Sequence, residues 1–156
     1  RRERRIKTEN IKINANDHAK TQELQHLITV STGFIDAYII QCFAKAPMLL
    51  PQNVVLSALD SQTHVSLVEW HDKQLPVFHV NNPDRKVGVA LVIEGEEIDQ
   101  RFALMCEEMP TSIRIRISEV VDDNLNIEDQ SIMQYVRIGA ELFHVPDLAY
   151  IQSQFS

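Results

Sequence analysis

The stretch that most constrains the fold is residues 65–80, VSLVEWHDKQLPVFHV, in which two short apolar runs flank a polar joint. The runs are rich in Val, Leu, Phe and Trp, and the joint, residues 71–74, is all polar, so the stretch predicts a β-hairpin. Pro76 lies near the start of the second run and has no N–H to give to a ladder. Its strand is therefore expected to lie at a sheet edge or to begin its pairing late. A strand edge that carries Trp70 beside a polar turn is a surface where another protein can dock.

Short apolar runs of this kind recur along the rest of the chain. In residues 34–44, FIDAYIIQCFA, both alternating sets of side chains are largely apolar, which predicts a strand buried on both faces. Residues 113–117 alternate between Ile and Arg, which predicts isoleucines inside and arginines in water near acidic neighbours. Further strands are expected at residues 86–93 and 101–106. A final hairpin is expected to turn near Gly139 and Ala140 and to lead into a C-terminal helix capped by Asp147. About nine short strands with little helix predict an all-β barrel or a pair of barrels.

Length and composition indicate one domain. The chain has 156 residues, of which 44% are apolar, enough for a sizeable core. No stretch reaches the roughly 20 apolar residues of a membrane span, and the first residues are too charged for a secretory signal, so we expect a cytoplasmic protein without membrane insertion. Cys42 and Cys106 lie inside apolar runs and are expected to be free thiols. Because the chain begins with arginine, we expect it to be a piece of a longer one.

The charge is divided between a basic start and an acidic body. The net charge is −7, but residues 1–20 hold seven Lys or Arg and three Asp or Glu, a balance of +4, which leaves −11 for the remainder. An acidic body repels phosphates, so nucleic acid is not an expected partner and an oligonucleotide-binding barrel is disfavoured. Residues 1–30 are expected to form a flexible basic arm with a weak helix signal at residues 17–28, followed by one domain over residues 31–156. The arm is either a solvated tail or a binding segment for an acidic partner or lipid headgroups.

Sequence motifs for catalysis are missing. The chain has no nucleophile elbow, no phosphate-binding glycine loop and no paired CxxC motif, and its six histidines form no HxH or HExxH pair. The acidic residues 120–130 lack the glycine and glutamate positions of a calcium loop. We therefore expect no enzyme activity, no cofactor and no metal. The alternative is a β-barrel enzyme or small-ligand-binding protein with an apolar pocket near His79 and His144.

Several strings, in this order, resemble the CheW-like domain of bacterial chemosensory systems, and within it the small adaptors of twitching-motility and pilus pathways. The resemblance covers roughly residues 33–155. It rests on order and spacing, because each string alone is weak. The strings are AYIIQCFAKAPMLLPQNVV, VSLVEWHDKQLPVFHV, RFALMCEEMPTSIRIRI and YVRIGAELFHVPDLAYI. Where the family has Arg-Gly after the first hairpin strand, this chain has His71 and Asp72.

The resemblance implies two small five-stranded β-barrel subdomains side by side around an apolar seam, with short helices and a C-terminal helix. It also implies a non-catalytic adaptor that couples methyl-accepting chemoreceptors to a CheA-type histidine kinase. Since a cation and a flexible glycine are replaced at the turn, partner choice is expected to differ from the family's. The residues expected to bind partners are Asn53, Trp70, His71, Asp72 and Pro76. The competing interpretation of Trp70 and Pro76 is ordinary packing in a core or turn.

Overall fold

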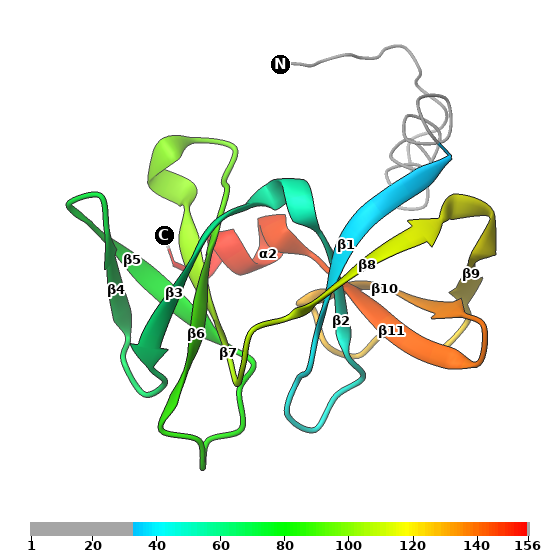
Figure 1. The fold of residues 1–156 in the computed structure, drawn as a ribbon, viewed down its shortest axis with the longest axis horizontal. Coiled ribbons are helices and arrows are strands. Elements are labelled where there is room, and N and C mark those ends of the chain that lie inside the picture. Colours follow the sequence, from blue (N-terminus) through cyan, green and yellow to red (C-terminus); the bar gives the residue numbers. More distant parts are fainter. Residues whose placement is uncertain (1–32, 156) are drawn as a thin grey trace.

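The computed structural model describes residues 33–155, which form two curled, mostly antiparallel sheets placed side by side (Figure 1). The basic arm predicted for residues 1–30 lies outside the described residues. The first sheet contains β1 (Phe34–Ile40), β2 (Met48–Pro51), β8 (Thr111–Arg116), β9 (Val120–Asp123), β10 (Ile132–Ile138) and β11 (Glu141–Pro146). The second contains β3 (Val55–Gln62), β4 (Leu67–Trp70), β5 (Lys73–His79), β6 (Val87–Ile93) and β7 (Phe102–Cys106). Three short 3-10 helices, η1 (Gln52–Val54), η2 (Ile98–Gln100) and η3 (Ile117–Glu119), and one α-helix, α2 (Leu148–Ser153), complete the described fold.

The first sheet has the strand order β8-β1-β2-β11-β10-β9, so its two edge strands are consecutive in sequence. β8 ends at Arg116 and β9 begins at Val120, with only η3 between them. The chain therefore bends at η3 and passes from one edge of the sheet to the other. The predicted pair of β-barrel subdomains is confirmed. The first sheet has six strands instead of five because η3 divides what would otherwise be one long strand.

The second sheet has the order β3-β6-β7-β5-β4 and contains the predicted hairpin as β4 and β5. β4 is the edge strand, whereas β5 lies between β4 and β7. The parallel pairing of β5 with β7 begins at Val77, directly after Pro76. The strand that contains Pro76 was expected either to lie at a sheet edge or to begin its pairing late. The late start is the correct expectation, because Pro76 precedes the first residue that pairs with β7 and its missing N–H interrupts no pair with that strand.

An apolar seam joins the two sheets. Its cluster draws on both: β1 and β2 contribute from the first sheet and β6 and β7 from the second. The buried members are Ile40, Met48, Leu50, Val80, Leu91, Ile93, Phe102, Leu104, Cys106 and Ile151. The chain crosses between the sheets twice, from β2 through η1 into β3 and from β7 into β8. The seam therefore connects the two sheets into one body.

Strands at the seam are buried on both faces, which explains their nearly continuous apolar sequences. In β7, Phe102, Leu104 and Cys106 face the seam, while Ala103 and Met105 fill the interior of the second sheet. In the same way, β1 places Ile40 in the seam and Ala37 in the interior of the first sheet. The strand predicted over residues 34–44 ends at Ile40, and it contributes buried side chains to both faces because successive side chains point to opposite sides. Phe43, which was expected in the same buried strand, lies beyond it and is 48% exposed.

The C-terminal helix closes the seam. The Asp147 carboxylate accepts a hydrogen bond from the Tyr150 backbone N–H at 3.0 Å, so Asp147 is the predicted N-cap. Ile151, which is 1% exposed, lies in the seam, and Leu148 packs against the same cluster. Both cysteines are free, as expected. No helix among residues 33–155 is long and apolar enough to cross a membrane.

Candidate functional site

The tip of the β4–β5 hairpin is a two-residue loop with unusual backbone angles. Trp70 pairs directly with Lys73, so only His71 and Asp72 form the loop, and their φ angles are 51° and 64°. Positive φ at both central residues is the geometry of the type I′ turn, which matches the twist of the flanking strands and favours Asn and Gly. The predicted polar joint at residues 71–74 is therefore tighter than expected, because Lys73 and Gln74 already belong to β5.

This turn gives a testable consequence. Asp72→Val is expected to lower the free energy of unfolding by about 1–2 kcal/mol, because a β-branched side chain is strained at positive φ. Asp72→Gly, the matched change that suits the angle, is expected to leave stability unchanged or raise it slightly. Urea denaturation of both variants measures the difference. Equal losses in the two variants would contradict positive φ angles at this turn.

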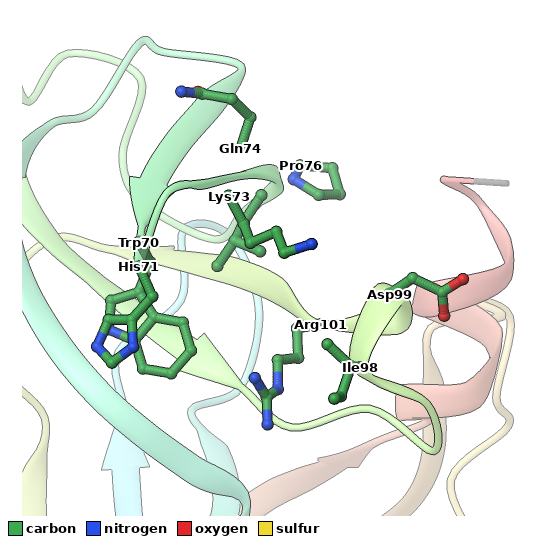
Figure 2. A pocket seen from close by; sticks show the side chains of 9 residues that line it. Trp70, His71, Lys73, Gln74, Pro76, Ile98, Asp99 and Arg101 are labelled. Carbon is green, nitrogen blue, oxygen red and sulfur yellow. The ribbon is translucent and has the colours of Figure 1, made fainter.

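A groove lies between the hairpin and η2, with a volume of about 260 Å³ (Figure 2). β4 and β5 form one wall and the segment around η2 forms the other. The residues that line it are Trp70, His71, Lys73, Gln74, Leu75, Pro76, Ile98, Asp99 and Arg101. Four of these side chains are apolar, namely Trp70, Leu75, Pro76 and Ile98, and Ile98 is 67% exposed. The groove is therefore lined by apolar side chains together with polar and charged ones.

Trp70 contacts two of the other residues that line this groove. Its ring stacks on the His71 ring with 4.0 Å between centroids, and the Arg101 guanidinium lies 5.5 Å from its centroid. At these separations the His71 imidazole and the Arg101 guanidinium each interact favourably with the π-electrons of the Trp70 ring. Trp70 also packs against the apolar interior of the second sheet, so only part of its surface is available to a partner.

The η2 wall is positioned by local hydrogen bonds and one ion pair. Arg101 donates to Glu94 from Nε at 2.8 Å, and this hydrogen bond holds the pKa of Glu94 below its usual value. Glu97 and Gln100 form a reciprocal capping box around η2. Because Arg101 is held by Glu94, its guanidinium is fixed beside Trp70 before any partner binds.

The structure brings together most of the predicted site residues. Trp70, His71 and Pro76 line the groove, and Asp72 completes the turn at its end. Asn53 is exposed in η1, where the chain crosses between the sheets, and is not among the groove residues. Its role in partner binding stays a prediction.

Sequence reasoning missed the second wall, Ile98, Asp99 and Arg101. The spacing of Glu97 and Gln100 is a capping-box pattern, so it is a signal for the short helix. No local pattern indicates that this segment, about thirty residues along the chain, meets Trp70.

Comparison with known proteins gives a structural match and no sequence match. No protein-family model matches the chain, and neither does any curated protein. The crystal structure of scaffolding protein TtCheW from Thermoanaerobacter tengcongensis superposes with a TM-score of 0.54 at 10% sequence identity. The match covers 72% of this chain and 88% of that chain. This chain has the CheW-like fold.

In this CheW-like fold, the interiors of the two sheets are packed with side chains. Leu75, Val77, Ala90, Val92, Ala103 and Met105 lie in the cluster within the second sheet. Ala37, Leu49, Ile115, Val136 and Phe143 lie in the cluster within the first. The groove of about 260 Å³ is smaller than the roughly 300–1,000 Å³ of usual small-molecule sites. Among residues 33–155, no group of three or more His, Cys, Asp or Glu is arranged to hold a metal ion.

The two histidines considered for an internal pocket lie in different sheets of the CheW-like fold. His79, on β5, is exposed and hydrogen-bonds to the Val65 carbonyl oxygen at 3.1 Å. His144, on β11, is 2% exposed, and its Nδ1–H donates to the Ala46 carbonyl oxygen at 2.8 Å. Each imidazole therefore stabilises a backbone segment, and the two do not converge on one site.

His144 makes stability depend on pH. Burial lowers its pKa below the usual value, so as pH falls the unfolded chain binds a proton before the folded chain does. Stability is therefore complete above about pH 6.5 and falls as the pH decreases from there toward the folded-state pKa. Asp129 nearby does not titrate in this range. Burial opposes its ionisation, but hydrogen bonds from Lys45 and Ser131 outweigh this and hold its pKa at about 2.

Urea denaturation between about pH 7.5 and pH 5 measures this effect. The parent is expected to lose stability toward the acidic end, and His144→Gln is expected to show a smaller change with pH, since the titrating group is gone. An identical pH dependence in the two proteins would contradict the assignment to His144.

Proposed function

We propose that this protein is a non-catalytic chemosensory scaffold that recognises other proteins through its outer surface. The single observation that carries the proposal is the CheW-like fold, which it shares with a solved scaffolding protein. The packed sheet interiors and the exposed groove support it, because together they offer a surface for a protein instead of an enclosed site for a small molecule. Such a scaffold carries out no chemistry and needs no cofactor.

The proposed partners are a CheA-type histidine kinase and the cytoplasmic tip of a methyl-accepting chemoreceptor. The family resemblance of the sequence strings supports this pair, and it supports a pathway of the twitching-motility or pilus type. Both partners present protein surfaces in the cytoplasm, which is the proposed location of this protein. The acidic body of −11 outside residues 1–20 argues against nucleic acid as a further partner.

The groove has the properties of a protein-binding surface. Trp70 provides a large aromatic anchor of the kind enriched at binding hot spots. Ile98 and Leu67 are 67% and 52% exposed, and Leu67 lies on the edge strand β4. Apolar side chains beside a strand edge suit either the insertion of a partner's side chains or the addition of a partner's strand. We place the kinase contact at this groove.

Asn53 marks a second surface in this proposal. It is exposed on η1 at the crossing between the sheets and does not line the groove. A scaffold that couples two partners needs two separate surfaces. We therefore assign the groove to one partner and the η1 region to the other.

A pull-down from the source cell tests the proposal. The full chain as bait is expected to capture a histidine kinase identified by mass spectrometry. Ile98→Glu is expected to lose most of this capture, because a carboxylate in the groove disrupts apolar contact. Val121→Glu is the matched control, since Val121 is 60% exposed but lies on β9 in the other sheet. Capture of no kinase by the parent bait, or equal capture by Ile98→Glu, would contradict the proposal.

A further inference from the structure

The β4–β5 hairpin has one side along which no other strand is paired. β4 is an edge strand of the second sheet, and among residues 33–155 it pairs only with β5. Figure 1 shows β4 at the end of the molecule opposite the first sheet. We call the side of β4 that faces away from β5 the β4 edge. A strand edge of this kind can be extended by a strand of another protein.

The turn determines which backbone groups of β4 point toward this edge. In a two-residue type I′ turn the residues that flank the loop, here Trp70 and Lys73, are a hydrogen-bonded pair. Hydrogen-bonded and non-hydrogen-bonded pairs alternate along an antiparallel ladder, so the next hydrogen-bonded pair is Val68 with Leu75. Glu69 lies between these two pairs. Its backbone N–H and C=O therefore point away from β5.

The position of Pro76 agrees with this assignment. Pro76 lies opposite Leu67, and by the same alternation these two residues are a non-hydrogen-bonded pair. A proline at a hydrogen-bonded position would remove one bond of the ladder, whereas at this position its missing N–H removes none between β4 and β5. Leu67 and Glu69 thus both direct their N–H and C=O groups toward the β4 edge. The two residues have the spacing that an antiparallel partner strand requires.

The side chains at these two positions indicate the chemistry of the added strand. Leu67 and Glu69 lie on the same face of β4, and both are exposed, Leu67 by 52%. Gln74, which lies opposite Glu69, is uncharged, and within the described part of the chain no cation forms an ion pair with Glu69. A strand on the β4 edge is therefore expected to place a Lys or Arg beside Glu69 and an apolar residue beside Leu67.

We propose that an extended segment of the partner kinase pairs with β4 as an additional strand of the second sheet. This inference rests on the proposed function and specifies how the kinase binds. Trp70 belongs to β4 and also lines the groove, so a segment on the β4 edge and one in the groove form a continuous contact. Backbone hydrogen bonds to Leu67 and Glu69 hold the segment, and its alternate side chains select the partner.

Amide hydrogen exchange of the full chain, read at single residues with and without the purified CheA-type kinase, tests the pairing. In the free protein the amides of Leu67 and Glu69 are expected to exchange rapidly. Those of Val68 and Trp70 are expected to exchange slowly, because they donate to β5. At saturating kinase the exchange of Leu67 and Glu69 is expected to slow at least about tenfold.

The outcomes of this measurement distinguish the two proposals. Kinase binding without slower exchange at Leu67 and Glu69 would overturn the added strand and leave the proposed function in place. A complete lack of kinase binding would overturn both. Rapid exchange at these two amides in the free protein is also required. If they exchange slowly there and the chain alone sediments as a dimer, the β4 edge is occupied by a second copy, which would likewise overturn the added strand.

Two changes at one residue separate the backbone from the side chain. Glu69→Pro removes an outward N–H that the hairpin does not use, and its ring obstructs an added strand, so kinase affinity is expected to fall at least about tenfold. Glu69→Ala keeps the N–H and removes only the charge, so its expected loss is roughly 2- to 5-fold. Equal losses in two folded variants would overturn the strand pairing. The exchange measurement needs no substitution, so it decides the question even if Glu69→Pro destabilises the hairpin.

Discussion

Replacing Leu91 with alanine is expected to lower the free energy of unfolding by about 3–5 kcal/mol, because it leaves a cavity at a fully buried site. Leu91 is 0% exposed and lies in the seam with Ile40 and Leu50 of the first sheet. The loss is expected to affect both sheets together, since the seam connects them. Urea denaturation followed by Trp70 fluorescence reports the second sheet, and far-ultraviolet circular dichroism reports both.

Leu56→Ala is the matched control for this prediction. Leu56 is also a leucine of the second sheet, but it is 37% exposed on β3, so its loss is expected to cost under about 1 kcal/mol. Because the seam connects the sheets, both probes are expected to show one shared transition in the parent and in Leu91→Ala. Two separate transitions, with only the fluorescence signal shifted, would show that the sheets fold independently.

Trp70→Ala is expected to weaken kinase binding by roughly 30- to 1,000-fold, which corresponds to about 2–4 kcal/mol for a hot-spot aromatic. The substitution removes the ring that His71 and Arg101 flank, and with it the largest aromatic surface of the groove. Titration of the full chain with the purified kinase, by calorimetry or interferometry, measures the change. Charge reversal at Asp72, at the end of the groove, is expected to weaken binding in the same direction.

Val68→Ala separates binding from stability in this experiment. Trp70 packs against the interior cluster of the second sheet, so its removal also destabilises the fold. Val68 is 7% exposed in the same cluster and does not line the groove. Val68→Ala is therefore expected to lose stability while it keeps its affinity for the kinase. Similar affinity losses in the two variants would assign the Trp70 effect to folding.

Features that depend on local sequence could be predicted without coordinates. The two hairpin turns, the two apolar faces of β1 and the Asp147 cap each follow from residues close together in the chain. The spacing of apolar residues, the residue types preferred in turns and the caps of helices each involve only a few neighbouring residues, so they can be recognised in the sequence. The predicted alternation on β8 holds for the same reason: Ile113 and Ile115 pack inward, and Arg114 lies 3.8 Å from Asp36 on the neighbouring strand.

Features that depend on distant contacts could not be predicted from this single sequence. The bend at η3 interrupts a segment whose alternation continues through Ile117, so the pattern gives no sign of the break. The contact between Arg101 and Trp70 joins residues on β4 and after η2, and it results from the order in which the strands pair. The groove wall formed by the hairpin could thus be predicted from the sequence, whereas the wall formed by the η2 segment could not.

In the proposed function, the outer groove, and not the sheet interior, recognises the protein partner. Hydrogen–deuterium exchange of the full chain with and without a CheA-type kinase tests it most directly. Added protection is expected in residues 67–79 and 96–104, the two walls of the groove, with little change along β9. Protection confined to other surfaces, or no protection at saturating kinase, would contradict it.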